Sequence, residues 1–246
     1  MTGYTVFASD ELPIDEEARW QITVDAWAPF MLEDPISNRL WDRMMSEYTP
    51  FQFSIFEGET MIAAGNSIPV VWDGGDLPDG GWDWALESAF EAQAAGIKPN
   101  TLCAISVTIA RSHVGKGVSR AAVEAMRGIA RKHGFDKLIA PVRPNQKHLY
   151  PLVPMERYIT WTHTDGEAPF DAWLRTHWRA GAQIVKVAPE SMVIRGTVAE
   201  WEGWASMRFP ESGSYVVPAA LNPVTIDRER DLGVYVEPNV WMLHTL

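Results

Sequence analysis

The feature that most constrains this chain is a glycine turn between an apolar run and an amphipathic helical pattern. The apolar run covers residues 102–110, and the turn contains Gly115 and Gly117. Apolar residues then recur at helical spacing and form one stripe: Val118, Ala122, Ala125, Met126, Ile129 and Ala130. A second apolar run covers residues 137–142. This order predicts a strand, a turn, a helix and a buried strand.

A helix that begins at such a turn is suited to anion binding, because its first backbone N–H groups have no intrahelical partner. A dinucleotide fingerprint would need a third glycine at position 120, which is Arg120. A P-loop would need Ser or Thr after Gly-Lys, but Lys116 is followed by Gly117. The interpretations left open are a loop that binds an acyl-coenzyme A pyrophosphate and a strand-to-helix turn without a ligand.

Composition narrows the class of protein. The chain has 246 residues, of which 46% are hydrophobic and 22% charged, as in globular proteins. Its formal charge of −11 disfavours a nucleic-acid partner and favours a cationic substrate. The single cysteine, Cys103, is expected to be a packed thiol in a reducing compartment. No apolar run is long enough to span a bilayer and no basic leader precedes the fold, so we expect a cytoplasmic protein.

Residues 109–119, Ile-Ala-Arg-Ser-His-Val-Gly-Lys-Gly-Val-Ser, resemble the signature of the GNAT superfamily of N-acetyltransferases. In that family a strand ends in a Val-x-Pro pattern, and an Arg/Gln-x-x-Gly-x-Gly/Ala turn then opens a helix. Val114 stands where Arg or Gln is usual, and Ser119 stands where Gly or Ala is usual. Both departures are tolerable because backbone N–H groups do most of the binding, and the Ser119 hydroxyl adds a donor.

The order of elements supports the resemblance. Helical patterns over 19–27 and 38–48 and a hairpin pattern over 51–57 and 60–72 precede the central strand. A solvated loop over 73–83 and a short inserted helix over 84–96 are expected next, and no metal site is expected. The resemblance implies an α/β fold with a GNAT-like mixed central sheet flanked by helices.

The predicted GNAT-like domain covers residues 1–197, with an insertion at 146–168. Within it, residues 183–187 and 191–195 are strand-like. A C-terminal extension covers 198–246 and is expected to pack on the same domain or on the second subunit of a homodimer. It contains a capping-box pattern at residues 197–200 and short β-like pieces near 215–217, 224–226 and 234–236, separated by prolines.

The resemblance implies that acetyl-coenzyme A is the co-substrate and that an acetyl group moves to an amine of a small molecule or peptide. Backbone N–H groups around Val107, Thr108 and Ile109 are expected to hold the thioester oxygen. Asn145 and Trp173 are predicted as further cofactor contacts. The pyrophosphate is expected at the turn and the helix start, formed by Val114, Gly115, Lys116, Gly117, Val118 and Ser119.

The family places a tyrosine proton donor four residues before a glycine in a later helix. If Gly181 is that glycine, the donor position holds His177, within a helical pattern over 170–182. His177 is interpreted as a proton donor, as a cofactor contact or as a structural residue, and Tyr150 is the reserve donor.

The base that removes the amine proton is not identified on the central strand. Asp25, Glu33, Glu200 and His244 stay open, and later tryptophans are candidates for an acceptor pocket or for the core. Two alternatives to acetyl transfer also stay open: a non-catalytic acyl-coenzyme A sensor, and an enzyme that transfers a longer acyl group.

Overall fold

The strands form one mixed sheet in a computed structural model that describes residues 3–12, 15–164 and 166–246. Its order is β1-β2-β3-β4-β5-β9-β8-β7, and β6 pairs with the other edge of β9. The strands are β1 Tyr4–Ala8, β2 Gln52–Glu57, β3 Thr60–Val70, β4 Thr101–Ile109, β5 Lys137–Val142, β6 Gln183–Gly196, β7 Gly213–Tyr215, β8 Val224–Asp227 and β9 Leu232–Thr245. The helices are α1 Glu16–Ala26, α2 Pro35–Glu47, α3 Gly81–Ala94, α4 Val118–Lys132, α5 Met155–Tyr158, α6 Ala172–Arg179 and α7 Val198–Ala205.

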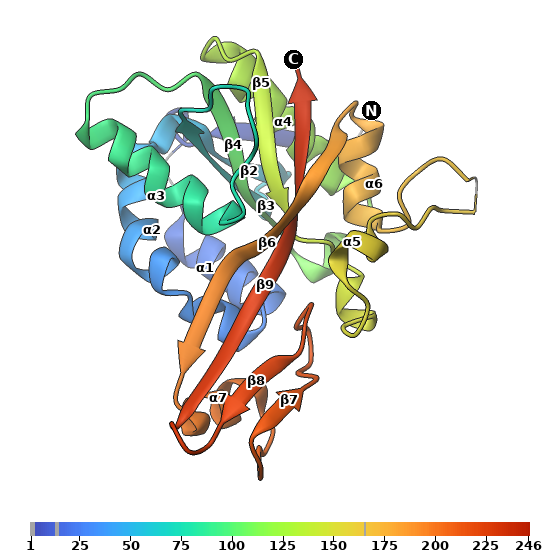
Figure 1. Cartoon of the computed structure of the whole chain (residues 1–246). Coiled ribbons are helices and arrows are strands. Elements are labelled where there is room, and N and C mark those ends of the chain that lie inside the picture. The colour runs from blue at the N-terminus through green and yellow to red at the C-terminus, as the bar shows by residue number, and fades with distance from the viewer. Residues whose placement is uncertain (1–2, 13–14, 165) are drawn as a thin grey trace.

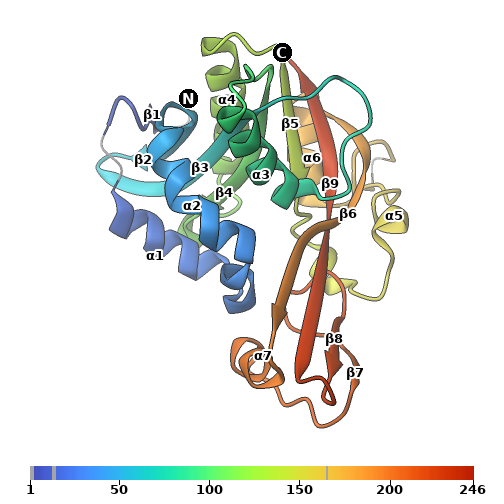
Figure 2. The same ribbon diagram turned by 60° about the vertical axis from the view of Figure 1, so that its left-hand side comes forward.

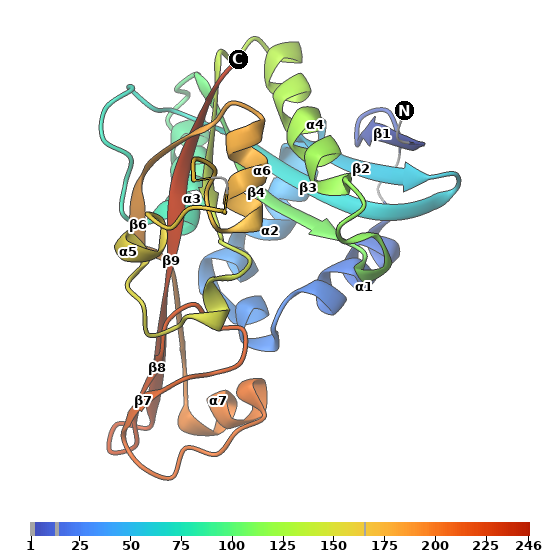
Figure 3. The same cartoon turned by 90° about the vertical axis from the view of Figure 1, so that its right-hand side faces the viewer.

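Helices lie on both faces of the sheet (Figures 1 and 3). The α2/α3 face also carries α1, and the α4/α6 face carries the helix that follows the glycine turn. Alternation along the strands sends neighbouring side chains into two separate cores, so Cys103 packs on the α2/α3 face and Leu102 on the α4/α6 face. The predicted α/β fold with a mixed central sheet flanked by helices is confirmed.

The central unit forms as its sequence predicts. β4 and β5 are parallel neighbours, and α4 connects them. The buried residues of α4 include Val118, Ala122, Met126, Ile129 and Ala130 of the predicted stripe, and Val123 beside it is buried as well. Gly134, just past the helix, has a φ of +77°. Each fully buried aliphatic side chain of this kind contributes about 1.5–3 kcal/mol relative to exposure.

The last strand differs from the expectation. Residues 232–245 form one long strand, β9, rather than short pieces, and its end pairs with β5 along residues 240–245. Pro238 does not interrupt β9 because it lies opposite an irregularity in β6, where residues 189–191 separate the paired residues Ala188 and Met192. The same pairing joins the two strand-like segments expected at 183–187 and 191–195 into β6. Residues 232–245, which lie within the expected C-terminal extension, are therefore part of the central sheet.

The inserted helix α3 begins at Gly81, earlier than the expected start at residue 84. Two tertiary hydrogen bonds fix its first turn: the Trp82 backbone N–H donates to Ser191 Oγ (2.8 Å), and the Trp82 indole N–H donates to the Ile105 carbonyl (2.9 Å). These partners are far away in sequence. The helix start therefore depends on contacts that a local pattern does not contain.

Two further segments agree with their local signals. The prolines of the 146–168 segment allow only a 3-10 turn, Lys147–Leu149, and the short α5 among its described residues, and residue 165 lies outside them. Helix α7 begins with the predicted capping box between Thr197 and Glu200. It forms a projecting arm with β7, β8 and the distal parts of β6 and β9 (Figures 1 and 2). Within the described ranges, every helix is too short or too polar to cross a membrane.

Candidate active site

The two central parallel strands separate soon after they pair. β4 and β5 are in register only at Leu102–Leu138 and Cys103–Ile139, although β4 continues to Ile109 and β5 to Val142. Just beyond the paired residues, β4 has one extra residue, Ile105, relative to β3. A bulge of this kind bends a strand and ends its pairing. The separation leaves a gap between the carboxyl ends of β4 and β5.

Backbone N–H groups of β4 point into this gap. The Ala110 N–H donates to the Ile62 carbonyl of β3 at 2.8 Å. Because hydrogen-bonding direction alternates along a strand, the Thr108 N–H also points to β3, whereas those of Val107 and Ile109 point away from it. The structure thus places two of the three predicted N–H groups in the gap. The third, that of Thr108, is directed into the β3–β4 ladder.

The turn before α4 places an uncapped helix start at the same end of the sheet. Gly117 is the N-cap residue, has the left-handed φ of +85° and provides no side-chain cap. The first-turn N–H groups of Val118 and Ser119 lack intrahelical acceptors, as at any helix start. Gly115 is also left-handed, at +80°. The exposed Lys116 brings positive charge to the turn, and the neighbouring Val114 is 66% exposed.

Asn145 and Trp173 also come together. Asn145 follows β5, and its Oδ1 accepts a hydrogen bond from the Trp173 N–H at 3.3 Å. Asp171 is the N-cap of α6 and accepts from the same N–H at 2.9 Å. Helix α6 therefore begins beside the end of β5. These contacts place both predicted cofactor residues near the gap.

His177 lies in a different environment from the one a proton donor needs. Its side chain is 2% exposed, its Nδ1 is hydrogen-bonded to Nε2 of His244 at 3.0 Å, and its ring packs against Trp173. His244 pairs with Leu138, at the level where β4 and β5 are still joined. Burial, with a smaller effect from His244, lowers the pKa of His177 to about 3. This low pKa disfavours the interpretation of His177 as a proton donor and favours its interpretation as a structural residue.

Tyr150 is less buried than His177. It belongs to the segment that follows β5 and is partly exposed. Its ring packs against Trp161 (5.0 Å between ring centroids) and Phe170 (5.9 Å), and this aromatic cluster lies on the α4/α6 face. Through these ring contacts, residues 146–168 pack against the segment that leads into α6.

On the α2/α3 face, a buried chain of hydrogen bonds reaches the gap. Arg19 Nη1 donates to Asn66 Oδ1 (3.1 Å), and Asn66 Nδ2 donates to Ser106 Oγ (2.7 Å). A guanidinium can only donate, so Asn66 must turn its oxygen to Arg19 and its NH₂ group to Ser106. Ser106 is therefore an acceptor here, and its own hydroxyl hydrogen is directed away from Asn66. Ser106 directly follows Ile105, the extra residue of the bulge in β4.

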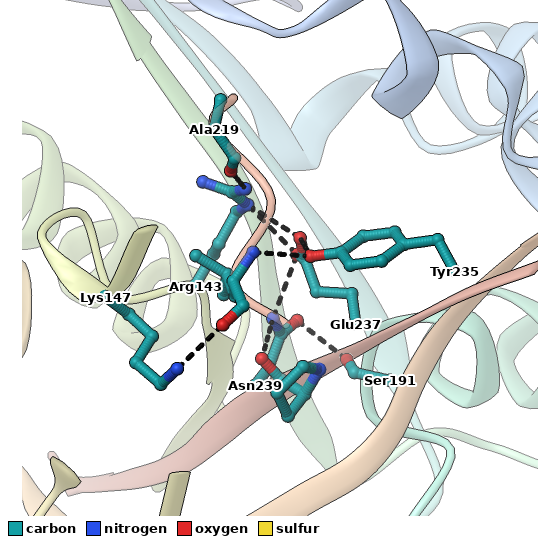
Figure 4. A network of polar contacts seen from close by, with 9 residues as sticks. Arg143, Lys147, Ser191, Ala219, Tyr235, Glu237 and Asn239 are labelled. Atoms are coloured by element: carbon teal, nitrogen blue, oxygen red, sulfur yellow. Dashed lines mark hydrogen bonds and ion pairs between the residues drawn. The ribbon is translucent and has the colours of Figure 1, made fainter. Parts of the chain in front are cut away.

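A second polar network lies where β9 has no strand neighbour on one side (Figure 4). Glu237 is fully buried, and its carboxylate accepts from Arg143 Nε (3.0 Å), the Tyr235 hydroxyl (2.9 Å) and Asn239 Nδ2 (3.2 Å). Arg143 follows β5, and its guanidinium lies over the Trp27 ring at 5.8 Å. The network joins the end of β5 to β9.

Sequence reasoning missed both networks. Their members are isolated polar residues in apolar strands, far apart along the chain. The only available signal was a polar residue at an inward-facing position, such as Asn66 in β3 or Glu237 in β9.

The open candidates for the base have other partners or lie at the surface. Glu200 bonds to Thr197 in the capping box of α7, and His244 is the buried partner of His177. Asp25 accepts a hydrogen bond from Gln21, and Glu33 is exposed. Most of the later tryptophans are packed at least in part, and Trp201 is wholly buried. Over the described ranges, His, Cys, Asp and Glu side chains form no group of three or more that would hold a metal ion.

Similarity to known proteins agrees with this geometry. No protein-family model matches the chain. The chain is 34% identical to the arginine N-acetyltransferase avaD of Aspergillus versicolor, over 89% of this chain and 85% of that protein. Its structure is similar to the loading GNATL domain of CurA from Lyngbya majuscula, with a TM-score of 0.61, 16% identity and coverage of 98% and 97% of the two chains. It is also similar to the GphF GNAT-like decarboxylase, with a TM-score of 0.56, 13% identity and 98% of each chain covered. At these identities, the two solved structures indicate a common fold.

Proposed function

The chain belongs to the GNAT superfamily of acetyl-coenzyme A-dependent N-acetyltransferases, and from this premise we propose that it acetylates a nitrogen of an arginine-like small molecule. It is an enzyme that transfers an acetyl group from acetyl-coenzyme A to a small-molecule amine. The observation that carries the finer proposal is the 34% identity, over 89% of the chain, to a protein named as an arginine N-acetyltransferase. The formal charge of −11 is also suited to a cationic acceptor.

The residues of the α4/α6 face fit the co-substrate. The uncapped start of α4 provides the N–H groups of Val118 and Ser119 for a pyrophosphate, and Gly117 leaves open space beside them. Asn145 and Trp173 border the same end of the gap. Acetyl-coenzyme A supplies an acetyl group that is activated as a thioester.

We assign stabilisation of the developing oxyanion to the N–H groups of Val107 and Ile109. Preorganised donors of this kind commonly lower a transfer barrier by about 3–4 kcal/mol each. On the opposite face, Ser106 offers its hydroxyl hydrogen to the bound substrates because its oxygen is already engaged by Asn66. The buried Arg19 holds Asn66 in the orientation that this arrangement requires.

Tyr150 is our proposed donor of the proton to the leaving thiolate. It lies on the α4/α6 face, after β5, and is partly exposed. A histidine with a pKa of about 3 has already lost its proton across the neutral range, so His177 is the weaker candidate.

The test is transfer by the purified full chain with acetyl-coenzyme A, measured as release of the free thiol. The acceptor panel contains arginine, agmatine, ornithine, citrulline, a polyamine and a peptide with a free N-terminus, and a reaction without amine measures hydrolysis. We expect thiol release above hydrolysis with arginine and agmatine, and mass spectrometry should detect the acetylated product.

The preferred acceptor decides the finer proposal. Preference for the peptide or for the polyamine over arginine would contradict an arginine-like acceptor but leave acetyl transfer in place. Binding of acetyl-coenzyme A without transfer to any amine would instead favour the sensor. Faster transfer from a longer acyl-coenzyme A would revise the donor.

A further inference from the structure

Electrostatic interactions link three carboxylates that come from three different elements. Asp34 caps the start of α2, Asp83 lies in the first turn of α3, and Glu237 lies in β9. The negative charges of Asp34 and Glu237 both act on Asp83, and that of Asp34 has the larger effect. Only Glu237 has a cationic partner, Arg143. Asp34 and Asp83 therefore interact electrostatically, and neither has a cationic partner among the described ion pairs.

Each of these two carboxylates has a buried oxygen without a hydrogen-bond partner. Asp34 is 0% exposed, and its Oδ1 accepts the Ser37 N–H at 2.7 Å, whereas its Oδ2 has no partner among the described residues. Asp83 Oδ1 is likewise buried and unpaired within the described ranges. A buried polar atom without a partner costs about 1–3 kcal/mol, and more when it is charged. Burial of these two oxygens is therefore costly unless a further group donates to them.

The pKa values of both carboxyl groups are raised. Burial raises the pKa of Asp34 to about 6. Burial, followed by the charge of Asp34, raises the pKa of Asp83 to about 8. A positive group between the two carboxylates would favour their ionised forms and provide the missing donors.

The chemistry of the surroundings indicates an organic cation. No metal site forms among the described His, Cys, Asp and Glu residues, so these carboxylates lack the ligand set that a metal ion requires. Helices α2 and α3 also bring two indole rings together. Trp82 adjoins Asp83 in α3, and its ring is stacked on Trp41 of α2 (6.4 Å, 16° between planes). Planar guanidinium groups pair with carboxylates through several N–H groups and stack on aromatic rings.

We propose that Asp34 and Asp83 form a subsite that binds the guanidinium group of the acceptor. The inference rests on the proposed function, because it names the part of that same acceptor site that recognises the cation. Asp83 is partly exposed and Asp34 is fully buried, so the cation enters past Asp83 and reaches Asp34. Arg143 keeps Glu237 neutralised behind the subsite, which leaves the other two carboxylates for the substrate.

The test compares isosteric variants on matched acceptors. Asp34→Asn keeps the helix cap, because asparagine caps a helix as well as aspartate does. Asp83→Asn keeps the size and shape of the side chain and removes only the ionisable group. Asp42→Asn is the control, since it removes the same charge from an exposed position on α2. Arginine is compared with citrulline, which replaces the guanidinium by a neutral group of similar shape, and with ornithine, which ends in an ammonium group.

We expect Asp34→Asn and Asp83→Asn each to lower kcat/KM for arginine about 10- to 100-fold, mainly through KM, because each removes a charge-assisted hydrogen bond. The kcat/KM for citrulline and the affinity for acetyl-coenzyme A should change less than threefold. Asp42→Asn should leave all three quantities unchanged. The melting temperature of Asp83→Asn should equal or exceed that of the unmodified enzyme, an outcome that a residue needed for stability would not give.

The outcomes separate this inference from the proposed function. If the unmodified enzyme uses arginine but the variants keep its preference for arginine over citrulline, the subsite is overturned and the proposed function stands. If ornithine is used as well as arginine, the guanidinium class is overturned. If no amine is acetylated by an enzyme that binds acetyl-coenzyme A, the proposed function itself fails. Loss of arginine preference in both variants supports the subsite.

Discussion

The buried pair of His177 and His244 links local chemistry to the pH dependence of stability. Burial lowers the pKa of His177 to about 3 and that of His244 to about 4, whereas an unfolded histidine has a pKa near 6.5. Below pH ~6.5 the unfolded chain therefore binds more protons at these positions than the folded chain does. The contribution of the pair to the free energy of unfolding is therefore complete above pH ~6.5. It is lost as the pH falls toward the folded-state pKa values.

At this residue scale, we predict opposite phenotypes for the two candidate proton donors. Tyr150→Phe should lower kcat about 100-fold or more and leave the affinity for acetyl-coenzyme A within a few-fold, because it removes a general acid but keeps the packed ring.

His177→Gln should leave kcat nearly unchanged. It should reduce the amount by which the free energy of unfolding falls between pH 6.5 and 5. Each buried histidine accounts for about 1–2 kcal/mol over that interval. Steady-state kinetics and urea unfolding across pH provide the two measurements.

Tyr158→Phe is a matched control for the tyrosine variant. Tyr158 belongs to the same aromatic cluster, but its hydroxyl is buried and donates to Asp171 Oδ2 at 2.9 Å. The control should therefore lower stability rather than kcat. A large fall in kcat for His177→Gln, with Tyr150→Phe fully active, would reverse the assignment of the donor.

At the scale of one element, the start of α4 carries the co-substrate assignment. Gly117 and Gly134 lie at opposite ends of this helix and have φ values of +85° and +77°, and no atom lies within 4 Å of the position that a β-carbon would take at either residue. Valine at either position should therefore cost about 1–2 kcal/mol of backbone strain. Only Gly117→Val places a branched side chain where the pyrophosphate is expected.

We expect Gly117→Val to weaken coenzyme A binding at least tenfold by calorimetry and Gly134→Val to leave it within twofold. The melting temperatures of the two variants should fall by similar amounts, so that strain alone does not account for a difference in affinity. Equal affinities for coenzyme A in the two folded variants would contradict the assignment of the pyrophosphate site to the start of α4.

The distance along the chain between contacting residues explains which parts of the fold could be predicted from the sequence. β4, the glycine turn, α4 and β5 follow one another, and each has a local signal, so the unit was predicted nearly residue for residue. The polar chain from Arg19 through Asn66 to Ser106 spans sequence separations of 47 and 40 residues, and no short-range pattern reports it. His177 was singled out because it lies in a helix at the position of the tyrosine in the family pattern. Its burial against His244 depended on β9, whose place in the sheet was not visible locally.

At the scale of the whole molecule, β9 holds the two parts of the sheet together. Residues 240–245 pair with β5, residues 233–243 pair with β6, and residues 232–234 pair with β8. Tyr235 and Trp241 from this strand are fully buried in the core of the α2/α3 face. The buried partner of Arg143, Glu237, also comes from β9. The last part of the chain therefore contributes to the core, the sheet and the polar network beside the site.

The last prediction separates a central strand from a dispensable tail. Loss of a buried aromatic side chain typically costs about 3–5 kcal/mol, and a whole domain is stable by only about 5–15 kcal/mol, so removal of Tyr235 and Trp241 alone consumes much of that stability. A chain that ends at residue 231 should therefore be insoluble or unfolded by circular dichroism. Cleavage at a protease site introduced into the exposed turn at residues 228–231 should instead leave the two fragments associated in size-exclusion chromatography, because β9 remains paired on both edges. A soluble truncated chain with an unchanged melting temperature would mean that residues 232–246 are an accessory to a complete fold.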